Sequence, residues 1–270
     1  EEHITQWFIK YILLPGALII DKPGFITVRY FEITGIGKFS RHIFLPEDLF
    51  VEIEKRAVKE KCEEAVYRAS KIFGWRCSQL MGITTKRHEK LEKIVAPLFT
   101  FFETMYSKSL HPEIISDHLL KLTARDLVVC RKSGVGLTTA GGYLAGMWAY
   151  IWQDPAIEVI KPFCQGRKDK ECVMYAAEYE KLKTLIEKEG WDTWIFKCND
   201  VTNEDELTYQ KLNKPVKLPS PSLRDLINQH FFTYDKSILR INDYRFFPNE
   251  ISILYLLEKE LALLNCKDLL

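Results

Sequence analysis

Apolar and polar residues near the start of the chain form short runs that predict β structure. The runs ALIID, PGFITVRYFEIT and KFSRHIFL, within residues 17–45, are rich in β-branched and aromatic residues and are separated by Gly and Pro. A helix is predicted to follow Pro46, because proline suits the first turn and Glu47 and Asp48 complement the helix dipole. Apolar residues at helical spacing extend this helix to residue 73.

The middle of the chain predicts two further helices and several strands. A second long apolar helix is expected over residues 86–107, and one or two strands over 117–131. A helix with many small residues follows at 137–152, and a polar turn joins two strands at 157–164 and 171–179. A charged helix is expected at 180–189.

The C-terminal part repeats a pattern from the N-terminal part. Residues 237–247 are strand-like with a turn at Asn242-Asp243, and Pro248 is predicted to open a helix that ends near Leu264. Phe44–Leu49 and Phe246–Ile251 share the order of aromatic residue, proline, acidic residue and amphipathic helix. This similarity suggests a degenerate internal repeat, with a chance recurrence of a strand–proline–helix junction as the alternative.

These elements predict an α+β fold in which helices pack on an antiparallel sheet, with a C-terminal α/β extension. We expect four parts: an N-terminal helical arm at 1–15, a ligand-binding domain at 16–180, a helix and linker at 181–222 ending in KLPSPS, and a strand–helix extension at 223–270.

Charge and cysteine content narrow the class of protein. The 38 basic and 37 acidic residues leave a net charge of +1, so a nucleic-acid partner is not expected. No run is long enough for a membrane span, and the first residues make a poor signal peptide. Seven cysteines, an odd number spread along the chain, do not form the pattern of a secreted disulfide framework. We therefore expect a cytoplasmic protein, and the abundance of Lys and Glu suggests a thermophilic source.

The stretch Gly141–Met174 has the most specific pattern. A helix with Gly142 and Gly146 precedes a hairpin in which Cys164 and Cys172 bracket a turn containing Gly166. This order resembles the C-terminal half of the 4-vinyl reductase domain, in which a GxxAG helix precedes a Cys–Gly–Cys hairpin. The resemblance covers residues 16–178.

The resemblance implies a mixed α/β fold that is usually dimeric and is related to the TRAPP vesicle-tethering subunits, which hold an acyl chain in a hydrophobic channel. In phenol-responsive bacterial activators the same domain senses aromatic effectors and carries a structural zinc, with an upstream Cys followed by Glu-x2-Cys-x7-Cys.

This chain keeps only part of that zinc pattern. Cys164 and Cys172 have the final spacing, but Lys161 stands in place of the Glu and Leu137 near the place of the upstream Cys. A structural zinc site needs four N, S or O ligands, so we expect no cofactor. Zinc on Cys164, Cys172 and a substituting Cys130 stays open, as do a Cys164–Cys172 disulfide and reduced thiols.

A ligand pocket is expected between the Gly-rich helix, the long apolar helices and the sheet, because large aromatic side chains form apolar walls. An ordinary core is the alternative for these residues. The candidate lining residues are Phe99, Phe102, Tyr106, Tyr143, Met147, Trp148 and Trp152.

No catalytic residues emerge from the sequence. It contains no HExxH, P-loop or dinucleotide motif, and no nucleophile–base pair is evident from spacing. We therefore expect a non-enzymatic module that senses a hydrophobic lipid or aromatic molecule and acts through a partner protein or a homodimer rearrangement. The alternatives are a TRAPP-like structural or adaptor subunit and a reductase-type enzyme.

Overall fold

The computed structural model describes residues 18–22, 25–29, 39–81, 83, 91–116, 118–199, 201, 223–235, 238–266 and 269. The predicted arm at 1–15, the start of the second predicted helix at 86–90 and most of the predicted linker lie outside these residues.

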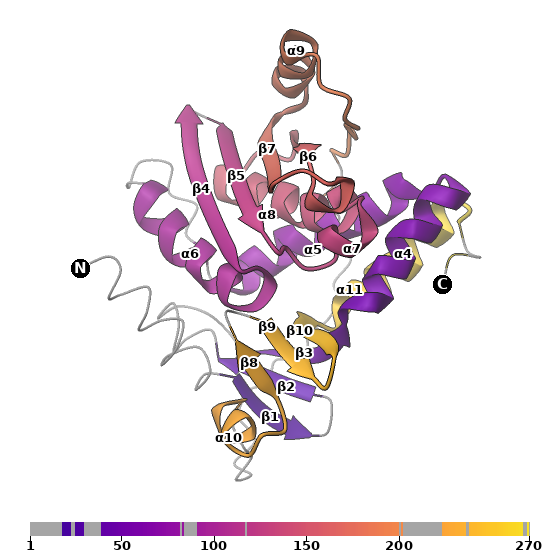
Figure 1. Ribbon diagram of the computed structural model, residues 1–270. Coiled ribbons are helices and arrows are strands. Elements are labelled where there is room, and N and C mark those ends of the chain that lie inside the picture. Colours follow the sequence, from indigo (N-terminus) through magenta and orange to yellow (C-terminus); the bar gives the residue numbers. More distant parts are fainter. Residues whose placement is uncertain are drawn as a thin grey trace.

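Two antiparallel sheets and a set of helices give the chain an α+β fold, as the sequence predicts (Figure 1). The larger sheet has six strands in the order β1-β2-β3-β10-β9-β8, and the smaller sheet has four in the order β4-β5-β7-β6. The strands are β1 (Leu18–Lys22), β2 (Phe25–Arg29), β3 (Phe39–Pro46), β4 (Ser109–Ser116), β5 (Leu119–Arg125), β6 (Ile157–Phe163), β7 (Cys172–Glu178), β8 (Thr233–Asp235), β9 (Ile238–Ile241) and β10 (Tyr244–Glu250).

The helices pack mainly around α5, which contacts α8 on one side and α11 on another. Helix α8 also lies on β6, and α6 lies on β4, so that helices cover the smaller sheet. The helices are α4 (Glu47–Glu60), α5 (Glu63–Leu80), α6 (Leu91–Tyr106), α7 (Cys130–Ser133), α8 (Gly142–Trp152), α9 (Tyr179–Glu189), α10 (Leu223–Asn228) and α11 (Ser252–Leu263).

The predicted helix at 47–73 is wrong in its extent, because two helices occupy this part of the chain. Helix α4 begins at Glu47 as predicted but ends at Glu60, and the left-handed backbone of the next residue, Lys61, turns the chain. Helix α5 then continues past Gly74 to Leu80. A Cβ at Gly74 would lie 2.1 Å from the carbonyl oxygen of Tyr143, so this glycine permits a close helix contact and does not end the helix.

The strand prediction for 117–131 holds only in part. Strand β5 ends at Arg125, and Cys130, which was expected in a strand, begins the short helix α7. The cause is a tight turn at Val129, where the amide of Cys130 donates to the carbonyl oxygen of Val128 at 2.8 Å.

The hairpin of β6 and β7 and the charged helix α9 are confirmed, as is the turn at Asn242-Asp243. The prediction that Pro248 opens a helix is wrong. Pro248 lies inside β10 and pairs with Phe44, and α11 begins at Ser252. The carboxylate of Glu250 accepts hydrogen bonds from the backbone amide and the hydroxyl of Ser252, the first residue of this helix.

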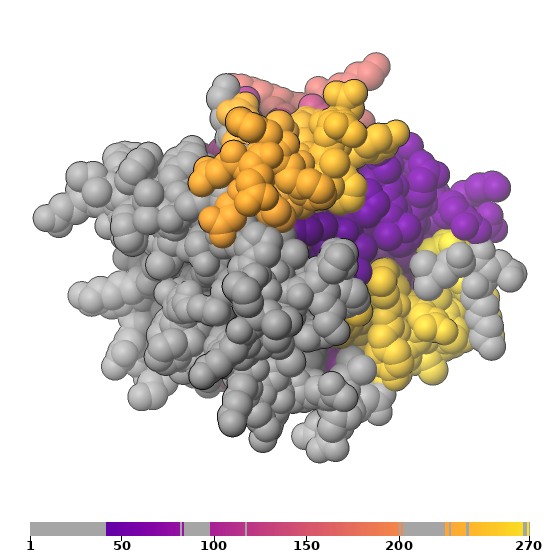
Figure 2. All heavy atoms as spheres, turned by 90° about the horizontal axis from the view of Figure 1, so that it is seen from below, coloured from indigo at the N-terminus to yellow at the C-terminus, as the bar shows by residue number. Residues whose placement is uncertain are grey.

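The two similar sequence segments are direct neighbours in the larger sheet. Phe247 of β10 pairs with Leu45 of β3 in antiparallel register. Figure 2 shows the C-terminal strands and α11 beside the N-terminal segment that contains α4 and α5. The C-terminal strands therefore complete a sheet begun by the N-terminal strands. The internal repeat and the boundaries of the four predicted parts stay predictions.

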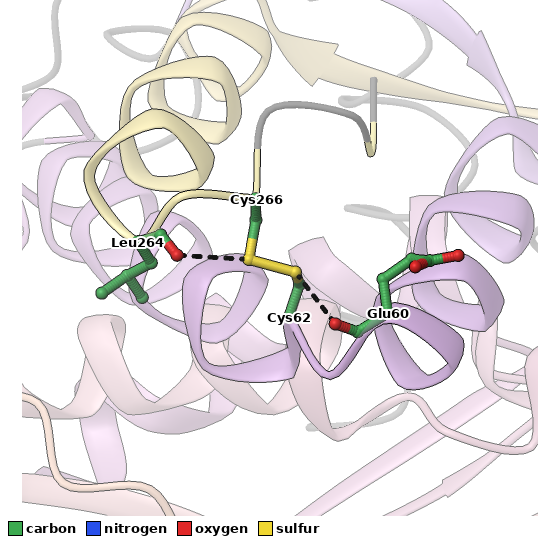
Figure 3. Close-up of a disulfide and its surroundings, with 4 residues drawn as sticks. All are labelled: Glu60, Cys62, Leu264 and Cys266. Atoms are coloured by element: carbon green, nitrogen blue, oxygen red, sulfur yellow. Dashed lines mark hydrogen bonds between the residues drawn. A yellow bond between two sulfur atoms is a disulfide. The ribbon is translucent and has the colours of Figure 1, made fainter.

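A disulfide joins Cys62, at the junction of α4 and α5, to Cys266, just after α11 (Figure 3). The sequence did not indicate this pair, which lies 204 residues apart. Cys164 and Cys172, for which a disulfide was an open alternative, do not form a disulfide.

The extended segment 191–199 is tied to the core by a buried ion pair. Lys71 and Glu158 lie 2.8 Å apart, and both side chains are fully buried. Lys71 also donates to the carbonyl oxygen of Cys198, and the Cys198 amide donates to Glu158.

Among the described residues, no helix is long and apolar enough to cross a membrane.

Candidate functional site

An apolar cavity of about 110 Å³ lies where α5, α6 and α8 meet the smaller sheet and the start of α11. Its lining is Phe50, Ser70, Phe73, Phe99, Phe102, Tyr106, Leu110, Leu122, Leu127, Val128, Val129, Thr139, Ala140, Tyr143, Leu144, Met147, Met174, Phe247, Asn249 and Ile253. These residues come from both halves of the chain, so the cavity exists only in the complete fold.

Five of the seven candidate lining residues lie around this cavity: Phe99, Phe102, Tyr106, Tyr143 and Met147. Trp148 and Trp152 do not line it. On α8 they follow Met147 by one and five positions, which turns Trp148 about 100° and Trp152 about 140° around the helix from Met147. Their rings contact each other, and Trp152 packs on His118 at the far end of the smaller sheet.

Aromatic rings form much of the wall and hold one another in place. The Phe102 ring meets the Tyr143 ring edge to face, with centroids 5.4 Å apart, and also contacts Tyr106. Phe247 joins this shell through both Tyr106 and Phe50. Phe247 was not a candidate, because nothing in the sequence places β10 beside α6. Such interlocked rings can leave a space open without collapsing into it.

Few polar groups face the cavity. The Tyr106 hydroxyl donates to the carbonyl oxygen of Pro248 at 2.8 Å, and burial raises the pKa of Tyr106, so this group stays protonated. The Ser70 hydroxyl is buried and has no hydrogen-bond partner among the described residues. Buried hydroxyls are usually paired, so Ser70 is a candidate for contact with a bound molecule.

A strained turn forms one side of the cavity. Val129 has a φ of 69° and a ψ of −47°, and the hydrogen bond from Cys130 to Val128 closes a γ-turn of the rare positive-φ type. A β-branched residue rarely adopts this conformation, and such strain is concentrated at functional sites. The buried carboxylate of Glu47 accepts a hydrogen bond from the Val129 amide at 3.0 Å, which helps to hold the turn.

A second buried carboxylate orders the segment that leads into α8. Glu54 accepts hydrogen bonds from the amides of Gly136 and Thr139, and from the hydroxyls of Ser133, Thr138 and Thr139. The segment Leu137–Gly141 forms a π-helical turn, a feature frequent at functional sites, and its Thr139 and Ala140 line the cavity.

The glycines of the predicted motif let α8 lie directly on α5. A Cβ at Gly146 would lie 1.8 Å from the carbonyl oxygen of Lys71, and one at Gly142 would lie 2.6 Å from that of Tyr67. Gly166 likewise lies against the backbone of Cys130 and Gly134. These three glycines therefore serve backbone packing.

Beside the cavity, Cys130, Cys164 and Cys172 gather around the buried Lys161. The Lys161 ammonium lies 2.8 Å from the Cys130 sulfur, and no carboxylate pairs with it among the described residues. A hydrogen bond from the Cys172 thiol, together with Lys161, lowers the pKa of Cys164 to about 5 and also lowers that of Cys130. The hydrogen bonds to Cys130 and Cys164 raise the pKa of Cys172, which stays a thiol.

This cluster does not fit the zinc that the resemblance implies. Burial alone would lower the pKa of Lys161, but the sulfur charges raise it above its ordinary value, so it stays an ammonium. An ammonium has no lone pair for a metal and repels a cation. Lys161 supplies the positive charge that zinc would bring to the thiolates.

Neither a protein-family model nor a curated protein gives a significant match to the chain.

Proposed function

We propose that this chain binds a compact hydrophobic molecule in the cavity between α5, α6 and α8. The observation that carries the proposal is the apolar cavity of about 110 Å³ with its shell of interlocked aromatic rings. An engineered cavity of about 150 Å³ with a similar lining stays dry and binds benzene. The volume favours a single-ring aromatic or a short chain over a long acyl chain.

The proposal includes membership of the 4-vinyl reductase domain family, as the resemblance implies. Its support is the arrangement of the motif. Helix α8 with Gly142 and Gly146 lies on β6, and Cys164 and Cys172 lie beside each other where the two strands meet the hairpin turn.

The cavity walls suggest how binding would be passed on. The strained turn at Val129 and the π-helical segment 137–141 both line the cavity, and each is held by a single buried carboxylate. A ligand that fills the cavity in one arrangement of these segments favours that arrangement by population shift. A homodimer or a partner protein would then respond to the changed surface.

An adaptor subunit is the second candidate function. Ile251, Tyr255 and Leu263, in and next to α11, expose 42%, 46% and 61% of their surface. Exposed apolar side chains along one element are typical of a protein-binding surface. A partial repeat would support an adaptor if another chain completed its sheet. Here β10 pairs with β3 of the same chain, so the repeat does not add to this candidate.

A thermal-shift titration with benzene, toluene, indole and fatty acids of increasing length tests the proposal. We expect the single-ring compounds to raise the melting temperature and the long fatty acids to have no effect. If none of these compounds changes the melting temperature, the cavity is not a binding site for this class of molecule.

A further inference from the structure

His118, Asp154 and Glu178 meet at the end of the smaller sheet, away from the cavity. His118 lies in the turn between β4 and β5, Asp154 follows α8, and Glu178 ends β7. One ligand atom of each lies within 4.8 Å of the others. His118 Nδ1 lies 3.2 Å from Glu178 Oε1 and 3.9 Å from Asp154 Oδ2. We propose that these three residues bind a divalent transition-metal ion, with zinc as the ion that the ligands fit best.

The distances suit one ion shared by the three ligands. Zinc binds histidine nitrogen and carboxylate oxygen at about 2.0–2.2 Å, which places tetrahedral ligand atoms roughly 3.3–3.5 Å apart. The pair His118 and Glu178, at 3.2 Å, is already close to this spacing. Asp154 needs to approach by a few tenths of an ångström, which a side-chain rotation supplies.

The imidazole nitrogen itself points to an ion. His118 Nδ1 is buried and faces two carboxylates, yet it has no hydrogen-bond partner among the described residues. A cation between them would accept the lone pair of Nδ1 and would attract both carboxylate oxygens at the same time. The other oxygen of Asp154 accepts a hydrogen bond from the Ala156 amide, which fixes the carboxylate and leaves Oδ2 free to ligate.

The surroundings favour an open site. The ring of Trp152 lies 4.2 Å from that of His118 and holds the imidazole in place, as supporting residues do for metal ligands. The Glu178 side chain is 53% exposed, so water can fill the fourth position. Imidazole is a poor ligand for magnesium and calcium, so a transition metal is the better fit. The bound ion joins the β4–β5 turn to the ends of α8 and β7.

Isothermal titration of the full chain, without a polyhistidine tag and after chelator treatment, tests this site with Zn²⁺. We expect saturable binding of one ion and a rise in melting temperature. The variant His118→Ala weakens binding by about tenfold or more. The matched variant His111→Ala, in the exposed part of β4, leaves binding unchanged.

Co²⁺ in place of Zn²⁺ separates this site from the cysteine cluster, because thiolate ligands give an intense charge-transfer band that nitrogen and oxygen ligands lack. We expect a Co²⁺ spectrum without this band. If His118→Ala does not fold, Glu178→Gln serves instead, since Glu178 is half exposed. Absence of saturable binding overturns the proposal, as does binding that shows the thiolate band and is unaffected by these variants.

Discussion

The Lys161 ammonium lies 2.8 Å from the Cys130 sulfur, and both side chains are buried. A buried positive charge is tolerated when it is paired, and here it lies beside cysteine sulfurs whose pKa is lowered. Because an ammonium takes the central place among three cysteines, the cluster is stabilised without a metal. The predictions below follow from this pair and from the segments that surround the cavity.

Replacing Lys161 by Met removes the cation and leaves the thiolates unpaired. We expect a loss of about 3 kcal/mol in the free energy of unfolding at neutral pH, the usual effect of breaking a buried ion pair. Burial then raises the pKa of Cys130 and Cys164, and the ultraviolet absorbance of the thiolate weakens. Urea unfolding and an absorbance titration measure the two effects. An unchanged thiolate absorbance would mean that Lys161 does not stabilise the charge.

The same cluster makes stability depend on pH. The pKa of Cys164 is about 5 in the folded chain, below the ordinary value of about 8.5. The stabilisation is therefore complete above about pH 8.5 and is lost as the pH falls through about 5. We expect the free energy of unfolding to fall over this window, with a shallower slope in Lys161→Met. Equal slopes in the two proteins contradict the assignment.

The Cys62–Cys266 disulfide closes a loop across most of the chain. Loss of such a cross-link increases the entropy of the unfolded chain, and we expect the double variant Cys62→Ser, Cys266→Ser to lose about 2–5 kcal/mol. Urea unfolding measures the difference. A reducing agent should destabilise the natural chain to a similar extent and leave the double variant unaffected. If reduction changes neither protein, the disulfide does not contribute to stability.

Glu54 is predicted to hold the segment 133–139 in place. Glu54→Gln converts one acceptor oxygen into a donor that faces amides and hydroxyls which also donate. We expect a loss of about 3 kcal/mol and faster hydrogen exchange at the amides of Gly136 and Thr139. Glu52→Gln, on the exposed face of the same helix, is the control and should change neither property. Unchanged exchange in Glu54→Gln would show that other contacts order the segment.

The cavity can be filled from its own wall. Ala140 is half buried and lines the cavity, so Ala140→Leu should occupy part of the space and weaken the binding of single-ring compounds by about tenfold or more. Ala156→Leu, a half-buried alanine outside the lining, is the control. Titration calorimetry with toluene compares the three proteins. Equal affinity in Ala140→Leu would place the binding site elsewhere.

Local sequence patterns predicted the elements whose ends are marked by their own residues. Pro46 with two acidic residues marks the start of α4, and the polar turn between β6 and β7 marks their hairpin. The aromatic stripe of α6 led to the candidates Phe99, Phe102 and Tyr106, which lie around the cavity. In α8 the same reasoning also selected Trp148 and Trp152, which do not line the cavity. The composition of an apolar helix does not show which of its faces lines a cavity.

Features that depend on distant parts of the chain could not be predicted from the sequence. The acidic residue that follows Pro248 predicted the start of a helix. In the fold, Pro248 instead pairs with Phe44 and lies in a strand. Phe247 belongs to the aromatic shell because β10 packs beside the N-terminal elements. Cys266 forms a disulfide with Cys62 because α11 packs beside them too. The strained turn at Val129 likewise depends on Glu47, which lies more than eighty residues earlier.

The four methionines of the chain allow the most direct test of the central claim. Met147 and Met174 line the cavity, whereas Met81 and Met105 are buried elsewhere and serve as internal controls. In a methyl-labelled protein titrated with toluene, we predict that the NMR signals of Met147 and Met174 shift and show contacts to the ligand protons, while those of Met81 and Met105 stay in place. Four unchanged signals, or shifts at Met81 and Met105 alone, would contradict binding in this cavity.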